Sequence, residues 1–233
     1  MDKEKLLDIL IDLIEEHNVP AVQVGIVKDG EIIFNEAVGY RDYENKIKAD
    51  TRTLFAIGSA TKAFVAEAIA ILVDEGKVEW DKPVQQYIPE FRMYNNYVSE
   101  NLTIRDILCH RSGLPRHDLM WYLNIDNFSL EDIIHKIRYL EPAQPFRYKM
   151  QYQNHMFGLA GYLIERVTGK KWSDFVRERI LLPLGMEDTN FSVEDSKKFE
   201  NKALPYDYYH GQIKELPFRN IDVVGAAGSI NSN

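Results

Sequence analysis

The sequence predicts a mixed fold of the α/β (α+β) kind, in which a small antiparallel sheet is flanked by helices and accompanied by a helical lobe. Three observations predict it. A β-hairpin pattern follows an N-terminal helix, most of residues 59–185 has helical periodicity, and short strand and turn patterns follow Met186. Two N-terminal strands form a marginal sheet by themselves, and residues 225–233 contain no apolar strand run that would extend it. We therefore expect the sheet to be incomplete in this chain.

Length and composition suit one large globular domain, or a main lobe that carries a smaller one. The chain has 233 residues, of which 45% are hydrophobic and 12% aromatic, ordinary values for a folded protein. We predict one domain over residues 1–233 with three parts. These are a terminal helix and hairpin at 1–40, a helical lobe at 59–185, and the start of a C-terminal α/β part at 186–233.

The N-terminal elements follow from the spacing of apolar residues. An apolar stripe interrupted by acidic residues predicts an amphipathic helix that ends near Asn18. Alternating branched residues over 22–26, followed by Asp29-Gly30, predict a strand and a hairpin turn, and 32–34 resume the extended pattern.

The middle of the chain reads as a series of helices with identifiable starts. The segment 60–75 has an apolar stripe wide enough to be mostly buried. Thr103 with Asp106, and Ser129 with Asp132, have the spacing of capping boxes at the starts of two further helices.

Later elements are bounded by glycine and proline. Residues 155–168 have a helical pattern that ends at Gly169, and the next helix is stopped by Pro183. His210-Gly211 marks a hairpin turn between two short strands.

Charge and cysteine content narrow the function classes. The formal net charge is −8, which argues against nucleic acid as a partner. Cys109 is the single cysteine, so no intrachain disulfide forms, and its place on the apolar side of a short helix predicts a core position.

The sequence shows neither a signal peptide nor an apolar run long enough to span a bilayer. We expect a cytoplasmic protein, although export followed by removal of a signal fits equally.

No metal or cofactor is expected. The six histidines lack any metal-ligand spacing such as His-Glu-x-x-His, and the chain contains no phosphate loop or dinucleotide fingerprint.

Ser59 and Lys62 form a pair that an ordinary buried helix does not need. Residues three apart share one helix face, with Cβ atoms about 5–6 Å apart. Ser59 stands at the start of the 60–75 helix, where free N–H groups and the positive end of the helix dipole favour a developing negative charge. A serine hydroxyl is a weak nucleophile until a base removes its proton. Lys62 becomes such a base, or tunes another one, if burial lowers its pKa.

The same two residues have an ordinary structural reading. Serine is a common N-cap, lysine is common in a first turn, and such pairs arise by chance in many proteins. On the pair alone, this reading is favoured over catalysis.

The surrounding segments resemble the serine β-lactamase and penicillin-binding protein superfamily. The stretch FAIGSATKAFVAEAIAILVDEGKVEWDKPVQQYIPEF is similar to its active-site helix region, and LTIRDILCHRSGLP and FRYKMQYQNHMFGLAGYLIERVTGKKW continue the likeness in the same order. The nearest branch is the class C β-lactamase-like group, which includes DD-peptidase-like proteins and esterases. The resemblance covers about residues 18–231 and implies a β-lactamase/transpeptidase-like fold.

The resemblance also implies roles for particular residues. Tyr152-Gln153-Asn154 is similar to a Tyr-x-Asn element that stands opposite the serine helix in that group. It implies that Tyr152 exchanges a proton with Ser59 and the leaving group. Asn154 would donate a hydrogen bond to a substrate amide or to Lys62. Whether tyrosine or lysine is the base stays open, and without the resemblance Tyr152 would read as a core-edge aromatic and Asn154 as a helix N-cap.

Two other parts of the group's pattern lead to different expectations. His110, in HRSGL, is expected to be a buried, hydrogen-bonded histidine in a turn, without a catalytic role. The group's Lys-Thr-Gly or His-x-Gly triad, on a strand that supplies the second oxyanion donor, is absent, because His210-Gly211 lies too early to match it. Losing one such donor costs about 2.7–4 kcal/mol. We therefore expect a C-terminally truncated chain with weak or no turnover by itself.

The combined interpretation is a serine hydrolase or acyltransferase-like protein. Ser59 would attack a carbonyl to form an acyl-enzyme, and the resemblance implies β-lactams, D-Ala-D-Ala peptides or small esters as substrates. Two alternatives remain, namely a carboxylesterase without β-lactam activity and a non-catalytic binding or assembly protein of the same fold. The expected partner is a small-molecule or peptide substrate and no nucleic acid, and the oligomeric state stays open.

Overall fold

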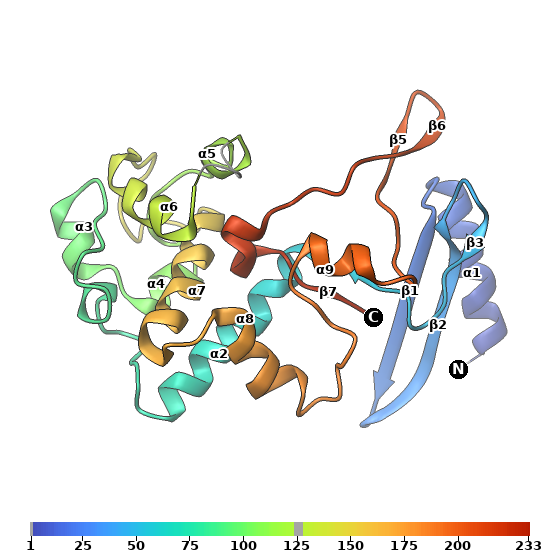
Figure 1. Cartoon of the computed structure of the whole chain (residues 1–233), viewed down its shortest axis with the longest axis horizontal. Coiled ribbons are helices and arrows are strands. Elements are labelled where there is room, and N and C mark those ends of the chain that lie inside the picture. Colours follow the sequence, from blue (N-terminus) through green and yellow to red (C-terminus); the bar gives the residue numbers. More distant parts are fainter. Residues whose placement is uncertain (1, 124–127) are drawn as a thin grey trace. The chain divides into compact units, whose positions relative to one another are not determined.

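The computed structural model describes residues 2–123 and 128–233 (Figure 1). The expected mixture of helices and antiparallel strands is confirmed. The chain divides into two compact units. One comprises Met1–Ala56, Asp188–Arg219 and Asn231–Asn233, and the other comprises Ile57–Glu187 and Asn220–Ile230. The single domain over 1–233 stays a prediction, and all four candidate site residues belong to the second unit.

The first unit begins with a helix and an antiparallel sheet in the order β1-β2-β3 (Figure 1). Their bounds are α1 (Lys3–Glu16), β1 (Ala21–Lys28), β2 (Glu31–Asp42) and β3 (Ile47–Lys48). The turn between β1 and β2 is the predicted one, since Asp29 has φ 53° and Gly30 has φ 83°. Two consecutive positive φ angles match the right-handed twist of the flanking strands, which is why Asp-Gly favours this hairpin.

The remaining strands of the first unit form two further small sheets. In one, β4 (Phe55–Ala56) pairs antiparallel with β7 (Asn231–Ser232). In the other, β5 (Tyr206–Tyr209) pairs with β6 (Gln212–Glu215), which confirms the hairpin turn at His210-Gly211. A short helix, α9 (Val193–Lys198), precedes this hairpin.

The second unit contains the helical lobe. Its α-helices are α2 (Thr61–Asp74), α3 (Asn96–Asn101), α4 (Ile104–Leu108), α5 (Leu119–Tyr122), α6 (Leu130–Lys136), α7 (Asn154–Thr168) and α8 (Trp172–Val176). The 3₁₀ turns are η1 (Gly58–Ala60), η2 (Val84–Gln86), η3 (Ile137–Tyr139) and η5 (Asp222–Ala227), and η4 (Arg177–Leu181) is a π-helical turn. Both predicted capping boxes, at Thr103 and at Ser129, are present.

Helix α7 is the centre of this unit. It contacts α2, α4, α6, α8 and η5, and α2 lies alongside it (Figure 1). Every residue from Asn154 to Ile164 is buried, so the helix is covered on all sides over three turns. It ends as predicted at Gly169, which adopts the left-handed conformation with φ 71°. The N-cap, however, is Gln153 and not Asn154.

One expectation about the core is wrong. Cys109 is exposed, because α4 ends at Leu108 and Cys109 occupies its C-cap, where the chain turns away from the buried face. Among the described residues, no helix has both the length and the apolar character needed to cross a membrane.

Gly161 allows η5 to approach α7 closely. A Cβ atom built on Gly161 would lie 2.7 Å from the Cβ of Ala226 and 3.4 Å from the Trp172 ring, so only glycine fits without movement. This close approach packs η5 against the middle of α7.

His155 lies fully buried one residue after the start of α7. Its Nδ1 is 2.6 Å from Oε1 of Gln153, and Gln153 in turn donates from Nε2 to the carbonyl of Pro115 at 2.6 Å. Burial lowers the pKa of His155 from 6.5 to about 4, so the ring is neutral in the folded protein at pH 7.

We predict that Gly161→Ala destabilises the protein by about 1–3 kcal/mol, the usual cost of overpacking a filled site. Urea unfolding measures this change. Gly25→Ala is the control, because a Cβ there meets no atom within 4 Å. Equal stability of the two variants would contradict the close packing of η5 on α7.

We also predict that stability falls as the pH drops from about 6.5 through about 4. The unfolded chain takes up a proton on His155 in this window and the folded protein does not, so the folded state loses on the order of 3 kcal/mol. Urea unfolding at pH 7, 5 and 4 measures the loss. The difference in pH dependence between the wild type and His155→Gln separates the contribution of His155 from that of the carboxylate groups. The control variant His17→Gln, at an exposed site, should show the same pH dependence as the wild type. A pH dependence that persists unchanged in His155→Gln would contradict the prediction.

Candidate active site

Ser59 sits in a constrained turn at the entrance of α2. Gly58, just before it, has φ 53°, a left-handed conformation that a residue with a side chain adopts only with strain. The turn is bracketed by Ile230. Its carbonyl accepts from the Ile57 N–H at 3.0 Å, and its own N–H donates to Oγ1 of Thr61 at 3.1 Å. The Ser59 side chain is thereby held at an exposed position in η1, the turn that leads into α2.

Lys62 is buried, with 8% of its surface exposed, and its ammonium has three oxygen acceptors. Nζ donates to Ser59 Oγ at 3.2 Å, to Asn154 Oδ1 at 2.9 Å and to the Ala227 carbonyl at 2.5 Å. A lysine ammonium has three N–H donors, and each has an acceptor here. The acceptors come from α2's own entrance, from the start of α7 and from η5.

Tyr152 completes the contact with the serine. Its Oη donates to Ser59 Oγ at 2.6 Å, and Lys62 Nζ lies 4.8 Å from the centre of its ring. The structure therefore brings together the hydroxyl, the amine and the phenol that sequence reasoning selected, across 93 positions of chain between the serine and the tyrosine.

Asn154 accepts from Lys62, whereas the sequence suggested that it would donate to Lys62. The direction is reversed because an ammonium group has no acceptor site. The amide's other end donates from Nδ2 to Asp118 Oδ1 at 3.0 Å. Since a carboxylate only accepts, Asp118 fixes which end of the Asn154 amide faces Lys62.

His110 holds Tyr152 in place through backbone hydrogen bonds and a contact between the two rings. Its carbonyl accepts from the Gln151 N–H at 2.8 Å and its Nδ1 accepts from the Gln153 N–H at 3.2 Å, so it holds the backbone on both sides of the tyrosine. The two rings are in contact, tilted by 37° to each other with centres 4.6 Å apart. Burial, together with the charge of Lys62, lowers the pKa of His110 and keeps Nδ1 available as an acceptor. The expectation of a buried, hydrogen-bonded histidine is confirmed.

The electrostatics of Lys62 and Tyr152 are linked. Burial lowers the pKa of Lys62, although the hydrogen bond and the charge interaction with Tyr152 oppose this. Burial raises the pKa of Tyr152, but hydrogen bonds to Lys62 and Ser59 and the charges of Lys62 and Arg116 outweigh it, so the net direction is down. The phenol is thus easier to ionise than an ordinary tyrosine.

Sequence reasoning missed three contributors to this site. Asp118 and Arg116 lie in the loop after α4, and Ala227 contributes only a backbone carbonyl. Arg116 and Asp118 follow HRSGLP directly in the sequence, and this position beside a family-like segment was the one sequence feature that pointed to them. A backbone carbonyl leaves no mark on the sequence.

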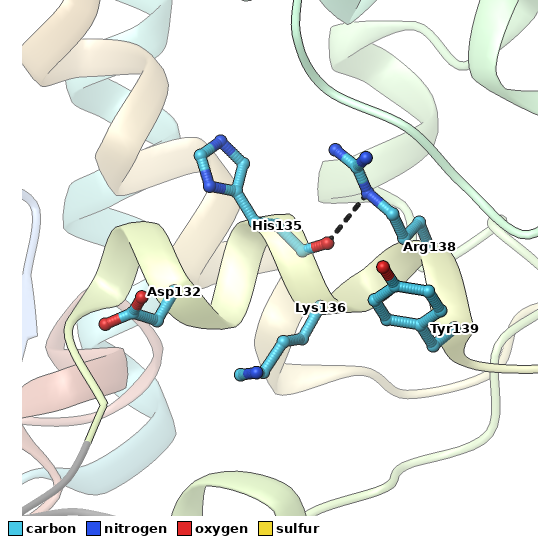
Figure 2. A pocket seen from close by; sticks show the side chains of 5 residues that line it. All are labelled: Asp132, His135, Lys136, Arg138 and Tyr139. Carbon is cyan, nitrogen blue, oxygen red and sulfur yellow. Dashed lines mark hydrogen bonds between the residues drawn. The ribbon is translucent and has the colours of Figure 1, made fainter.

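Among the described residues, no group of three or more His, Cys, Asp or Glu side chains is arranged so that it could hold a metal ion. A separate hollow of about 280 Å³ lies along α6 and η3 (Figure 2). It is lined by Asp132, His135, Lys136, Arg138 and Tyr139. Their charged ends point in different directions, and Arg138 donates from Nε to the carbonyl of His135, so the hollow has no convergent polar set and includes none of the candidate site residues.

Comparisons with known proteins identify the family and the fold. A family model described as beta-lactamase matches residues 6–232. An unguisins hydrolase of Aspergillus campestris is 35% identical over 97% of this chain and 44% of its own length. The octameric penicillin-binding protein homologue from Pyrococcus abyssi has a TM-score of 0.84 and 29% identity, covering 100% of this chain and 54% of that protein. The D-amino acid amidase from Ochrobactrum anthropi SV3 has a TM-score of 0.82 and 27% identity, covering 100% of this chain and 68% of its own.

The chain spans about half the length of the curated relative and of the Pyrococcus protein. The family match over nearly its whole length, together with the hydrolase relative, shows that this chain belongs to the beta-lactamase family, within the serine β-lactamase and penicillin-binding protein superfamily.

Proposed function

We propose that this protein captures an acyl group on Ser59 and is a serine hydrolase or acyltransferase. The observation that carries the proposal is the position of Ser59 Oγ, 2.6 Å from the Tyr152 phenol and 3.2 Å from the Lys62 ammonium. A nucleophile needs a base within hydrogen-bond reach, and a second group that orients that base. Tyr152 and Lys62 meet both requirements around an exposed hydroxyl.

Tyr152 is the better candidate for the base. Burial lowers the pKa of Lys62, but all three N–H bonds of its ammonium have acceptors, an arrangement that suits the charged form. A charged lysine has no lone pair with which to accept a proton, but it stabilises a phenolate beside it. The lowered pKa of Tyr152, produced mainly by Lys62 and Ser59 against the opposing effect of burial, supports this assignment.

The reaction then proceeds in two balanced steps. Ser59 Oγ attacks the substrate carbonyl carbon while its proton moves to Tyr152, and the leaving group departs with that proton, which leaves an ester on Ser59. A water or another acceptor then attacks the ester, and the proton that it releases returns through Tyr152 to Ser59. The first-turn N–H groups of α2 favour the negative oxygen that forms in each step.

Amides and esters are the substrate class that this site fits. The relatives support this choice, since one is named for hydrolysis of unguisins and another is an amidase for D-amino acids. β-Lactams, D-Ala-D-Ala peptides and small esters all present a carbonyl of this type. Parallel assays with a fluorescent penicillin and p-nitrophenyl butyrate separate a β-lactam-reactive protein from an esterase.

We predict that a fluorophosphonate labels the protein once, and that Ser59→Ala abolishes the label, because the reagent bonds to an activated serine oxygen. Intact-mass spectrometry measures the adduct without requiring turnover. Ser173→Ala, which changes another serine outside this site, should keep the label. An adduct that remains on Ser59→Ala, or a folded wild type that never reacts, would contradict acyl capture at Ser59 and favour a non-catalytic binding protein.

We predict that the labelling rate rises with pH as Tyr152 loses its proton, and that Tyr152→Phe removes this rise and slows labelling about 10²- to 10⁴-fold. The rise comes from conversion of the phenol into the phenolate that accepts the serine proton, and the lowered pKa of Tyr152 brings it toward neutral pH. Labelling rates from pH 5 to 10 measure it, with the exposed Tyr148→Phe as control. A pH-dependent rise that survives in Tyr152→Phe would assign the base to Lys62.

A further inference from the structure

A second cation lies beside the Tyr152 ring. The guanidinium carbon of Arg116 is 5.3 Å from the ring centre, close to the 4.8 Å of Lys62 Nζ. Arg116 is largely exposed, with 63% of its side chain open to solvent, and none of the reaction steps proposed above uses it. A cation at this range from an aromatic ring is attracted to its electron-rich face, and the attraction increases when the ring carries a negative charge.

Asp118 holds this cation in place. Its Oδ2 accepts from Nε of Arg116 at 2.7 Å, while its Oδ1 accepts from Asn154 at 3.0 Å and from Trp121 Nε1 at 3.3 Å. The carboxylate therefore links the guanidinium to the amide that contacts Lys62. The result is a closed ring of contacts that runs from Lys62 through Asn154, Asp118 and Arg116 to Tyr152.

We propose that Arg116 is a positioning residue for the reaction at Ser59, and that its guanidinium, anchored by Asp118, acts with Lys62 to favour the ionised form of the Tyr152 phenol. Arg116 does not touch the reacting atoms and works through Tyr152. The inference rests on the proposed function in one respect, which is that Tyr152 exchanges a proton with Ser59.

The charged and titratable groups around Tyr152 are consistent with this role. Lys62 approaches from α2, Arg116 and Asp118 from the loop after α4, and His110 from the C-terminal side of α4. His110 is held neutral by burial, which lowers its pKa. Asp118 is the one anion of this group. Its oxygens accept hydrogen bonds from Arg116, Asn154 and Trp121, and these donors reduce the effect of its negative charge on the Tyr152 phenol.

A plain surface ion pair between Arg116 and Asp118 is the competing explanation. Exposed pairs of this kind contribute little to stability. Arg179 provides a matched control within the same chain. It pairs with Glu75, and its guanidinium carbon lies 5.5 Å from the centre of the Phe175 ring, so Arg179→Gln removes the same charge from the same kind of pair beside a ring that does not ionise.

The ionisation of Tyr152 can be read directly by ¹³C NMR on protein labelled at the Cζ atom of tyrosine, with the Tyr152 signal assigned by its loss in Tyr152→Phe. We expect Arg116→Gln to move the titration midpoint of Tyr152 to higher pH, Arg116→Lys to move it less, and Arg179→Gln to leave it unchanged. On the rising part of the pH profile, Arg116→Gln should also slow fluorophosphonate labelling roughly two- to fivefold, the size expected for an exposed cation near an aromatic ring.

Each other result counts against the proposal. An unchanged midpoint in Arg116→Gln, or the same shift in Arg179→Gln, would overturn it, and so would an equal shift in Arg116→Gln and Arg116→Lys, because the charge would then not be the cause. The NMR titration needs no acylation. A failure of this inference is therefore distinct from a failure of the proposed function, which the Ser59→Ala labelling experiment tests.

Discussion

The buried ammonium of Lys62 is the group on which the rest of the site depends. A charge taken out of water is tolerated only when its hydrogen bonds are replaced, and here three oxygens replace them. Each oxygen comes from a different element, so the charge requires the α2 entrance, the start of α7 and η5 to be in register at once. The burial of α7 on all sides and the bare backbone of Gly161 are the packing features that meet this requirement. The contact that makes Ser59 a candidate nucleophile is thus a consequence of how one cation is accommodated.

The parts of the fold that the sequence predicted well are those set by local chemistry. Asp29-Gly30 requires a particular turn, Thr103 with Asp106 closes a capping box, and Gly169 ends a helix, and each effect operates within a few residues. The same holds for Ser59 and Lys62, whose proximity follows from helix geometry alone. Cys109 was placed wrongly because helical periodicity was extended one residue beyond the last turn of α4.

The remainder of the site depends on contacts between distant segments. Tyr152 and Asn154 lie 93 and 92 positions from their partners, and only the family resemblance, not periodicity, connected them to Ser59 and Lys62. His110 was expected to be structural. His110 is structural, and it acts by accepting hydrogen bonds from the backbone on both sides of Tyr152. This position requires a left-handed backbone at a non-glycine residue, with φ 56°. The role of the Ala227 carbonyl could not be predicted, because every residue has a backbone carbonyl. The packing of η5 determines that this one accepts a hydrogen bond from Lys62.

The hydrogen bonds between Ile230 and the serine turn determine when that turn can reach its final conformation as the chain is synthesised. Ile230 and Ala227 follow their partners in the α2 region by 169 and 165 positions, so these contacts form only after the chain between them has been synthesised. Closing so large a loop carries an entropic cost that local helices do not bear, and contacts of this range form late in folding. Until segment 220–230 docks, the lysine stays hydrated and the serine turn lacks its brace. A nascent chain that lacks segment 220–230 therefore holds Ser59 in a turn without this brace.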